Sequence, residues 1–180
     1  METTHLQIRP LLPEDAPALF RLTSDPAVTH YMRFSTHMAP RQAEELIKSY
    51  TAPGCAGFTL VEKATGRYAG VIALKPEGRS GEYSVSVMLT PALWNRGYAT
   101  QALHAMVGYA QTVLFARMIS AYVVGENQSS RRVLAKCGFM AEEKREYDGT
   151  SDGLYYLSPA VGWRRRSLCP CVRWCGPSPS

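Results

Sequence analysis

The spacing of hydrophobic residues among polar ones has two different periods in the middle of the chain. From residue 82 to 89, every second residue is apolar or aromatic, namely Tyr83, Val85, Val87 and Leu89. This alternation predicts a half-buried strand. From residue 99 to 114, apolar residues recur at three- and four-residue steps, which predicts a helix with one apolar face. A strand therefore leads into a helix through a short junction.

The junction itself predicts an anion site. Pro91 removes a hydrogen-bond donor and ends the strand, and Gly97 lets the backbone come close to a bulky group. The first N–H groups of the following helix lack internal acceptors, and the helix dipole adds partial positive charge. Our hypothesis is that a phosphate binds there.

The rest of the chain predicts a single α/β (α+β) domain with the element order βααβββαβαββ. About four helices flank a mixed, mostly antiparallel central sheet. The other expected strands are 5–9, 58–62, 68–74, 118–124, 139–146 and 154–157, and the other expected helices are 13–23, 41–50 and 127–136. An irregular stretch at 27–39 is rich in aromatic and basic residues.

The net charge and the lengths of the apolar runs exclude some classes of function. Of the 20 Lys and Arg residues, four follow residue 160, so residues 1–160 carry 16 basic against 15 acidic side chains. A net charge of +1 argues against a nucleic-acid-binding face. No apolar run is long enough to span a membrane and no leader segment is evident, so we expect a cytoplasmic protein without membrane partners.

The C-terminal segment differs from the rest. Residues 161–180 contain abundant Arg and Pro and the cysteines Cys169, Cys171 and Cys175. Such a cysteine cluster could bind zinc, but a fourth ligand is absent and the spacing is unusual, so we expect no metal. We therefore expect a folded domain at 1–160 and a disordered tail at 161–180.

Two motifs carry a family resemblance. Residues 94–100 read WNRGYAT, and residues 127–139 read NQSSRRVLAKCGF. With this spacing and element order, residues 5–158 resemble the GNAT superfamily of acyl-CoA-dependent N-acetyltransferases. Trp94 and the Asp25-Pro26-x-Val28-x-x-Tyr31-Met32 pattern look closest to the branch that acetylates the N-termini of ribosomal proteins.

The resemblance implies acetyl-CoA as cosubstrate. The first motif would hold its pyrophosphate through backbone amides and the Arg96 side chain, and the second would lie along its pantetheine arm. The strand before the junction would face the thioester carbonyl, and a distortion in its pairing would free an N–H as oxyanion donor. Gly97 as an ordinary helix entry and Asn127 as a simple helix cap stay open as alternatives. The implied cofactor-binding residues are Val87, Met88, Leu89, Arg96, Gly97, Tyr98, Ala99, Thr100, Asn127 and Ser130.

The catalytic expectations are less direct. Leu134 stands where many members have a proton-donating tyrosine, so Ser130 would protonate the departing thiolate, unless it is merely a solvated serine. Glu82, Tyr83 or a water chain would deprotonate the amine. Gln101 stands where the ribosomal branch usually has Glu. Ser84, Ser86 and Val87 stand where that branch often has Glu and a Gly-Tyr pair, so a carboxylate proposed as the base in some relatives is missing here.

In the irregular stretch, Tyr31, Arg33 and Phe34 are expected to contact the acceptor, whereas His30 and His37 are expected to be surface histidines. The predicted function is N-acetyltransfer from acetyl-CoA to a primary amine, of a protein N-terminus or a small molecule, by direct transfer in a ternary complex. The alternative is a catalytically weak, regulatory acyl-CoA-binding module. The protein would be a monomer or a homodimer.

Overall fold

The computed structural model describes residues 1–124, 126–146 and 152–159. Its strands are β1 (Leu6–Pro10), β2 (Ala56–Glu62), β3 (Tyr68–Pro76), β4 (Glu82–Leu89), β5 (Met118–Val124), β6 (Met140–Glu146) and β7 (Asp152–Pro159). Its α-helices are α1 (Ala16–Thr23), α2 (Pro26–Thr29), α3 (Pro40–Tyr50), α4 (Tyr98–Thr112) and α5 (Gln128–Lys136), and two 3-10 turns are η1 (Pro13–Asp15) and η2 (Pro91–Leu93).

The predicted fold class and element order are confirmed, with one addition. The stretch expected to be irregular begins with the single helical turn α2. Pro26 presets the backbone at the first helical position, and the Asp25 carboxylate accepts a hydrogen bond from the Ala27 N–H at 2.9 Å. This local capping is enough for one turn.

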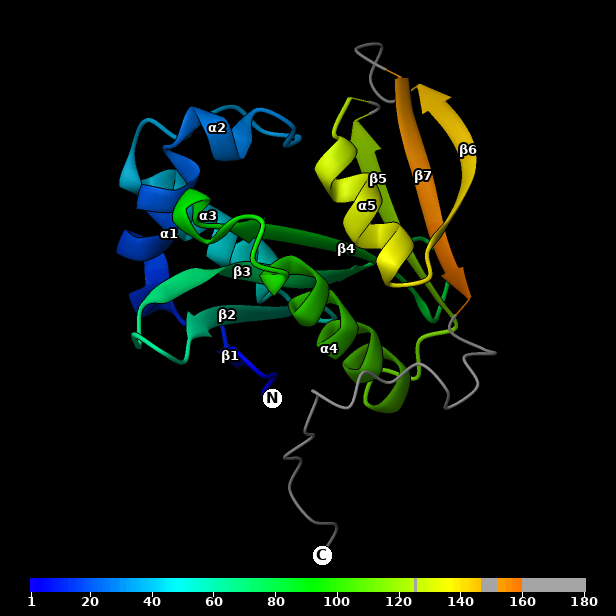
Figure 1. The fold of residues 1–180 in the computed structure, drawn as a ribbon, viewed down its shortest axis with the longest axis horizontal. Helices are drawn as coiled ribbons and strands as arrows, with labels where there is room; N and C mark the ends of the chain where they lie inside the picture. The colour runs from blue at the N-terminus through cyan, green and yellow to red at the C-terminus, as the bar shows by residue number, and fades with distance from the viewer. Residues whose placement is uncertain (125, 147–151, 160–180) are drawn as a thin grey trace, which may run out of the picture.

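The seven strands form one sheet in the order β1-β2-β3-β4-β5-β7-β6. Every neighbouring pair is antiparallel except β4 and β5, which are parallel. β3 and β4 pair from Gly70↔Leu89 to Pro76↔Tyr83, whereas β4 and β5 pair only from Glu82↔Met118 to Ser84↔Ser120. Figure 1 shows β5, with β7 and β6 beside it, turned away from the direction of β4.

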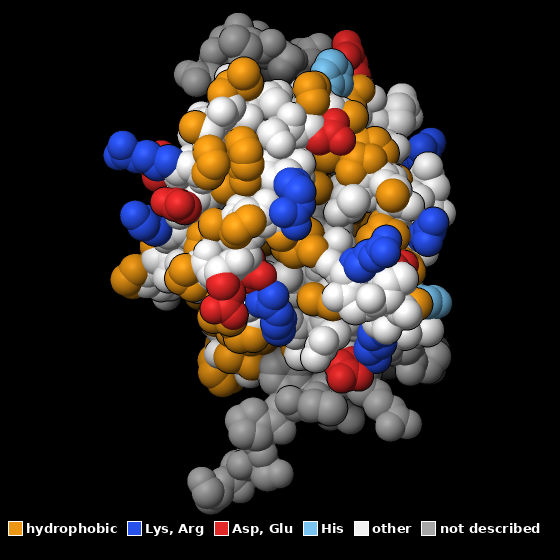
Figure 2. Space-filling view, turned by 90° about the vertical axis from the view of Figure 1, so that its left-hand side faces the viewer, with side chains coloured by type: hydrophobic (Ala, Val, Ile, Leu, Met, Phe, Trp, Pro, Cys, Tyr) orange, Lys and Arg blue, Asp and Glu red, His pale blue; other side chains and the backbone are white. Residues whose placement is uncertain are grey.

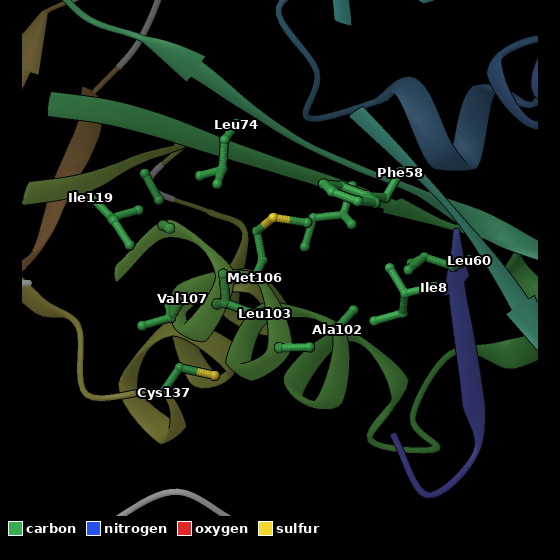
Figure 3. Close-up of a cluster of buried hydrophobic side chains, with 14 of the residues drawn as sticks. Ile8, Phe58, Leu60, Leu74, Ala102, Leu103, Met106, Val107, Ile119 and Cys137 are labelled. Carbon is green, nitrogen blue, oxygen red and sulfur yellow. The ribbon is translucent and has the colours of Figure 1, made fainter. Parts of the chain in front are cut away.

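The larger core lies between the sheet and α4. The apolar face predicted for this helix supplies Ala102, Leu103, Met106 and Val107, all nearly inaccessible to solvent. They pack against strand residues that include Ile8, Phe58, Leu60, Leu74 and Ile119, and Cys137 reaches the same cluster from the end of α5 (Figure 3). This packing fixes α4 against the sheet, and with it the junction that precedes α4.

The smaller core covers the other face of the sheet. Leu19 and Leu22 of α1 and Ala43 and Ile47 of α3 pack there against strand residues such as Val71. The expectation that His37 is a surface residue is wrong: its side chain is buried, and Nδ1 lies 2.9 Å from the Thr23 hydroxyl of α1. Burial lowers the pKa of His37. His37 therefore anchors the end of the loop that follows α2.

The remaining expectations fall partly outside the described residues. The tail at 161–180, its three cysteines and the boundary at residue 160 are not among them. Within the ranges that the structure describes, none of the helices has the length and apolar character needed to cross a bilayer.

Candidate active site

The two faces of β4 and β5 have different chemistry. Val85 and Val87 of β4 pack with Ile119 and Ala121 of β5 in the core beneath α4. Because successive side chains of a strand alternate, the residues between them point to the α1–α3 side. These residues are Ser84 and Ser86 of β4 and Ser120 and Tyr122 of β5, and Ser86 confirms the orientation by hydrogen bonding to Tyr50 of α3 at 3.3 Å.

An opening in the sheet begins beyond Ser84 and Ser120. The two strands stop pairing there, so the edge of residues 85–89 that faces β5 has no partner strand in the part of the chain described. The distortion expected within the strand pairing is not found between β3 and β4, whose register is regular over this stretch. Backbone groups without a strand partner arise instead because β4 and β5 diverge. Such an opening can hold an extended group that passes between the two strands.

The junction before α4 has the geometry of an anion site. Gly97 adopts a left-handed conformation, with φ 76°, and its carbonyl oxygen accepts the Gln101 N–H at 3.1 Å. No side chain caps this helix N-terminus. A Cβ added to Gly97 would meet no protein atom within 4 Å. The first amides of α4, those of Tyr98, Ala99 and Thr100, therefore lack an intrahelical acceptor and adjoin open space.

Two side-chain contacts hold the junction against the sheet. The indole Nε1 of Trp94 donates to the Leu89 carbonyl oxygen at 2.8 Å, and the Tyr98 hydroxyl donates to Glu62 Oε1 at 2.9 Å. Hydrogen bonds from Thr65 and Tyr98 lower the pKa of Glu62. The ionised Glu62 side chain is therefore a fixed anchor at the end of β2.

Arg96, which sequence assigned to the pyrophosphate, has a contact that sequence did not predict. Its guanidinium Nη1 lies 3.8 Å from Glu62 Oε1, and more than half of the side chain is exposed. At 3.8 Å the contact is long, and water screens it at the exposed arginine, although the Glu62 side chain is buried. If Arg96 turns to an anion at the junction, Glu62 keeps its hydrogen bonds from Thr65 and Tyr98.

The second motif lies against the first. Asn127 caps α5, because its Oδ1 accepts the Ser130 N–H at 3.0 Å, so the capping alternative is real. At the other end of α5, the Cys137 thiol donates a hydrogen bond to the Thr100 carbonyl oxygen, with Sγ 3.7 Å from that oxygen. Burial raises the pKa of Cys137 to about 12, so the thiol stays protonated. This contact joins the end of α5 to the first turn of α4.

The structure does not bring the two expected catalytic residues together. Glu82 pairs with Met118 at the start of β5, whereas Ser130 lies in the first turn of α5, just beyond the end of β5 at Val124. These strand ends are about 20 Å apart at the usual rise per residue. Ser130 thus lies near the open end of the strand pair and Glu82 at the closed end.

Sequence reasoning missed a carboxylate at the closed end. The Ser120 hydroxyl donates to Glu77 Oε2 at 3.1 Å, and Ser120 belongs to the last paired rung, on the α1–α3 side. Glu77 follows β3 in a turn and shows no periodic pattern, so only the three-dimensional pairing reveals it. Among the described residues, Glu77 is thus a carboxylate in hydrogen-bond contact with the rung at which the opening begins.

Gln101, one of the departures from the ribosomal branch, has a structural role. Its Oε1 accepts the Thr3 hydroxyl at 2.8 Å, and its Nε2 lies 3.0 Å from His5 Nδ1. These bonds attach the N-terminal segment to α4, on the outside of the helix. Gln101 therefore faces away from the opening and toward the chain terminus.

The three expected acceptor residues lie in one loop on the α1–α3 side, and two of them line a hollow of about 560 Å³. The hollow is lined by Pro26, Thr29, His30, Met32, Arg33, Phe34, Ser35 and Thr36. Tyr31 packs edge-on against His30 instead. The Arg33 guanidinium carbon lies 4.3 Å from the ring centre of Tyr122 on β5. The loop therefore reaches the strand that borders the opening.

Comparison with known proteins gives a consistent result. Residues 5–140 match the family described as the acetyltransferase (GNAT) domain. An uncharacterised N-acetyltransferase of Bacillus subtilis (strain 168) is 28% identical over 149 residues, which cover 79% of this chain and 83% of the relative. The FsC-acetyl coenzyme A-N(2)-transacetylase of Aspergillus fumigatus is 29% identical, over 86% of this chain and 71% of its own.

Solved structures share the fold at lower identity. A GNAT-family acetyltransferase of Bacillus anthracis has a TM-score of 0.79 at 22% identity, over 89% of this chain and 98% of its own. A spermidine N-acetyltransferase of Vibrio cholerae, solved with CoA and spermine, has a TM-score of 0.76 at 17% identity, over 87% and 96% of the two chains. The likeness to the ribosomal branch is not confirmed by these comparisons.

Proposed function

Since the chain belongs to the acetyltransferase (GNAT) domain family, and is an acetyl-CoA-dependent N-acetyltransferase, we propose that it transfers the acetyl group directly to a primary amine across the opening between β4 and β5. The divergence of these strands after Ser84↔Ser120 carries this proposal. It gives two substrates access to one point from opposite faces of the sheet. Bringing reactants together in this way can contribute up to about 7–11 kcal/mol to catalysis.

The residues of the junction fit the pyrophosphate of coenzyme A. The uncapped amides of Tyr98, Ala99 and Thr100 would donate to it, and Gly97 leaves the space in which it would lie. Arg96 would add a charge-assisted hydrogen bond once it leaves Glu62. Backbone groups of Val87, Met88 and Leu89 and the polar groups of Asn127 and Ser130 would border the rest of the cofactor.

Transfer requires two proton movements besides bond exchange. The amine nitrogen bonds to the acetyl carbonyl carbon, the carbon–sulfur bond breaks, and its electron pair leaves on sulfur. We propose that the Ser130 hydroxyl supplies the proton that the thiolate takes up, since it lies at the open end of the strand pair. The proton lost by the amine goes to a carboxylate on the α1–α3 side, directly or through water.

Two carboxylates compete for that second role. Glu82 is the one that the sequence suggests, and Glu77 is the one held by Ser120 at the last paired rung. We favour Glu77, because its contact with Ser120 directs it to the rung from which the opening begins. Glu82 starts β4 two residues earlier.

The acceptor is a small-molecule amine or a protein N-terminus. Spermidine acetyltransferases share the fold, but an identity of 17% gives no argument for the same acceptor. The likeness of residues 25–32 to the ribosomal branch is the argument for a protein N-terminus. A screen of amines by thiol release from acetyl-CoA tests the proposal, and a chain that binds acetyl-CoA but acetylates no amine would be the regulatory module instead.

A further inference from the structure

Building on the proposed transferase activity, we infer that the Ser86 hydroxyl accepts one N–H of the attacking amine, that Tyr50 holds this hydroxyl in position, and that the pair selects primary over secondary amines. Ser86 lies on the α1–α3 face of β4, the face from which the amine would approach the opening. Neither side chain has a part in the cofactor binding or the proton transfers proposed above.

The place of Ser86 along β4 is the first argument. The last rung shared with β5 is Ser84↔Ser120, so Ser86 is the next residue on the same face, about 7 Å further along the strand. Ser86 is half-buried and therefore partly open to solvent. A nitrogen in contact with its hydroxyl would be close enough to Glu77, which Ser120 holds at that rung, to pass a proton to it directly or through water.

The backbone beside Ser86 is the second argument. The Thr90 N–H donates to the Ala69 carbonyl oxygen of β3 at 2.9 Å. Because backbone groups alternate between the two sides of a strand and the β3–β4 register is regular, the even-numbered residues of β4 bond to β3. Val87 consequently directs its N–H toward β5, beyond the last rung that the two strands share. An acetyl carbonyl that accepts this N–H would lie beside Ser86.

Tyr50 determines which group Ser86 offers to an amine. Ser86 Oγ donates to the Tyr50 hydroxyl at 3.3 Å, and this bond uses the single proton of the serine hydroxyl. Ser86 therefore presents a lone pair, which accepts an N–H. Tyr50 is only 4% exposed, and burial raises the pKa of its phenol, so the phenol stays neutral and holds Ser86 without acting as a base.

Tyr50 is itself held in place. It is the last residue of α3, which packs on the sheet through Ala43 and Ile47. The Lys75 ammonium lies 4.9 Å from the centre of the Tyr50 ring and donates to the Ser49 hydroxyl at 3.0 Å. Binding an amine at Ser86 therefore requires little ordering of these side chains.

The chemistry of transfer makes such an acceptor selective. A primary amine carries two N–H bonds when its nitrogen bonds to the acetyl carbon. One proton passes to the carboxylate, and the other N–H stays hydrogen bonded to Ser86 until the amide has formed. A secondary amine has one N–H, which it must give up, so its second substituent would face Ser86 and leave the hydroxyl without a partner.

The surface charge offers no comparable selection. Figure 2 shows basic and acidic side chains interspersed over the end of the molecule that α1, α2 and α3 form. A surface with both signs interspersed does not favour one class of amine by its field. Hydrogen bonds to the reacting nitrogen are then the stronger source of selectivity.

The test compares amines that differ by one N-methyl group. One pair is the primary amine that releases thiol fastest in the screen and its N-methyl derivative, and the other is a peptide beginning with alanine and the same peptide beginning with N-methylalanine. We expect kcat/KM to be about tenfold higher or more for the primary member of each pair that is acetylated.

Variants assign the effect to the two residues. Ser86→Ala should lower kcat/KM for the primary amine about tenfold and abolish most of the preference, whereas Ser86→Thr keeps a hydroxyl and should retain part of it. Tyr50→Phe should weaken the preference less than Ser86→Ala does. Combined with Ser86→Ala, it should cause no further loss, because both variants remove the same hydrogen bond.

Tyr68→Phe is the matched control for Tyr50→Phe. The Tyr68 hydroxyl is also buried and packs against the same smaller core, but it has no hydrogen-bond partner among the described residues. Its removal should leave the preference unchanged. Thermal unfolding of both Phe variants shows whether each is folded at the assay temperature.

Two results would overturn the inference and leave the transferase proposal intact: equal kcat/KM for primary and N-methylated amines, and a preference that survives Ser86→Ala. Losses that add up in the double variant would contradict the part assigned to Tyr50. A chain that binds acetyl-CoA but acetylates no amine at all contradicts the proposed function itself.

Discussion

The Tyr98 hydroxyl donates a hydrogen bond to Glu62, so the first residue of α4 is attached to the last residue of β2. Tyr98 directly follows Gly97 in the chain. Trp94 makes a second attachment, to the end of β4. The amides at the start of α4 are thereby held in place before any ligand arrives, which is the condition for tight binding of an anion.

Gly97→Ala should weaken acetyl-CoA binding about tenfold or more, because its Cβ would project into the space that a phosphate would occupy. The left-handed backbone adds a cost of about 1–2 kcal/mol to folding. Gly66→Ala is the matched control, since Gly66 has φ 67° and open space around its Cβ but lies in the turn between β2 and β3. Calorimetric titration and thermal unfolding measure both effects. Equal affinities in the two variants would remove Gly97 from the binding site.

Ser130→Ala should lower kcat by tenfold or more and leave the affinity for acetyl-CoA nearly unchanged, because a proton donor acts in the chemical step. Its N–H, which donates to Asn127, is retained in the variant. Ser129→Ala alters the neighbouring, exposed serine and should have little effect. A wild-type rate for Ser130→Ala would exclude this hydroxyl from the mechanism.

Glu77→Gln and Glu82→Gln distinguish the two candidate bases. We expect Glu77→Gln to lower kcat/KM about 10²-fold or more and to remove one limb of its pH dependence, as loss of a general base does. Ser120→Ala should lower kcat/KM by a smaller factor, because it removes the hydroxyl that positions Glu77. The opposite ranking of the two Gln variants would assign the role to Glu82.

His37 should make the protein less stable in weak acid. Burial lowers its pKa in the folded state, so below a pH of about 6.5 the unfolded chain binds a proton that the folded chain binds less readily. Stability then rises with pH through this window and falls as the pH drops. His104, whose pKa burial also lowers, acts in the same direction. The free energy of unfolding, measured with denaturant at pH 5.5 and 7.5, should differ less between the two pH values in His37→Asn than in the wild type. An equal difference in both proteins would show that another group causes the effect.

Local periodicity was enough to predict the strand-to-helix unit and the order of the elements. Alternation over residues 82–89 and helical spacing from residue 99 are properties of single segments, and both are confirmed. The uncapped start of α4 followed from the same local reading. The branch assignment rested on a few positions of variable loops, and the comparisons do not confirm it.

The features that sequence missed depend on distant pairs. Ser120 and Glu77 are 43 residues apart, and nothing in either segment indicates their contact. The divergence of β4 and β5 is likewise a property of two strands together, so the sequence suggested a distortion within one strand instead. His37 resembled a surface residue because an irregular loop has no period from which burial can be inferred.

The three-residue pairing of β4 with β5 also has a mechanical consequence. Among the residues that the structure describes, it is the only strand pairing between the β1–β4 and β5–β7 parts of the sheet, so few interstrand hydrogen bonds must break for these parts to separate. Amides of the paired rungs should therefore exchange with deuterium sooner than those between β2 and β3. A ligand that contacts the first turns of both α4 and α5 would bridge the two parts. Binding of such a ligand should slow that exchange, so substrate binding would also stabilise the contact between the two parts of the sheet.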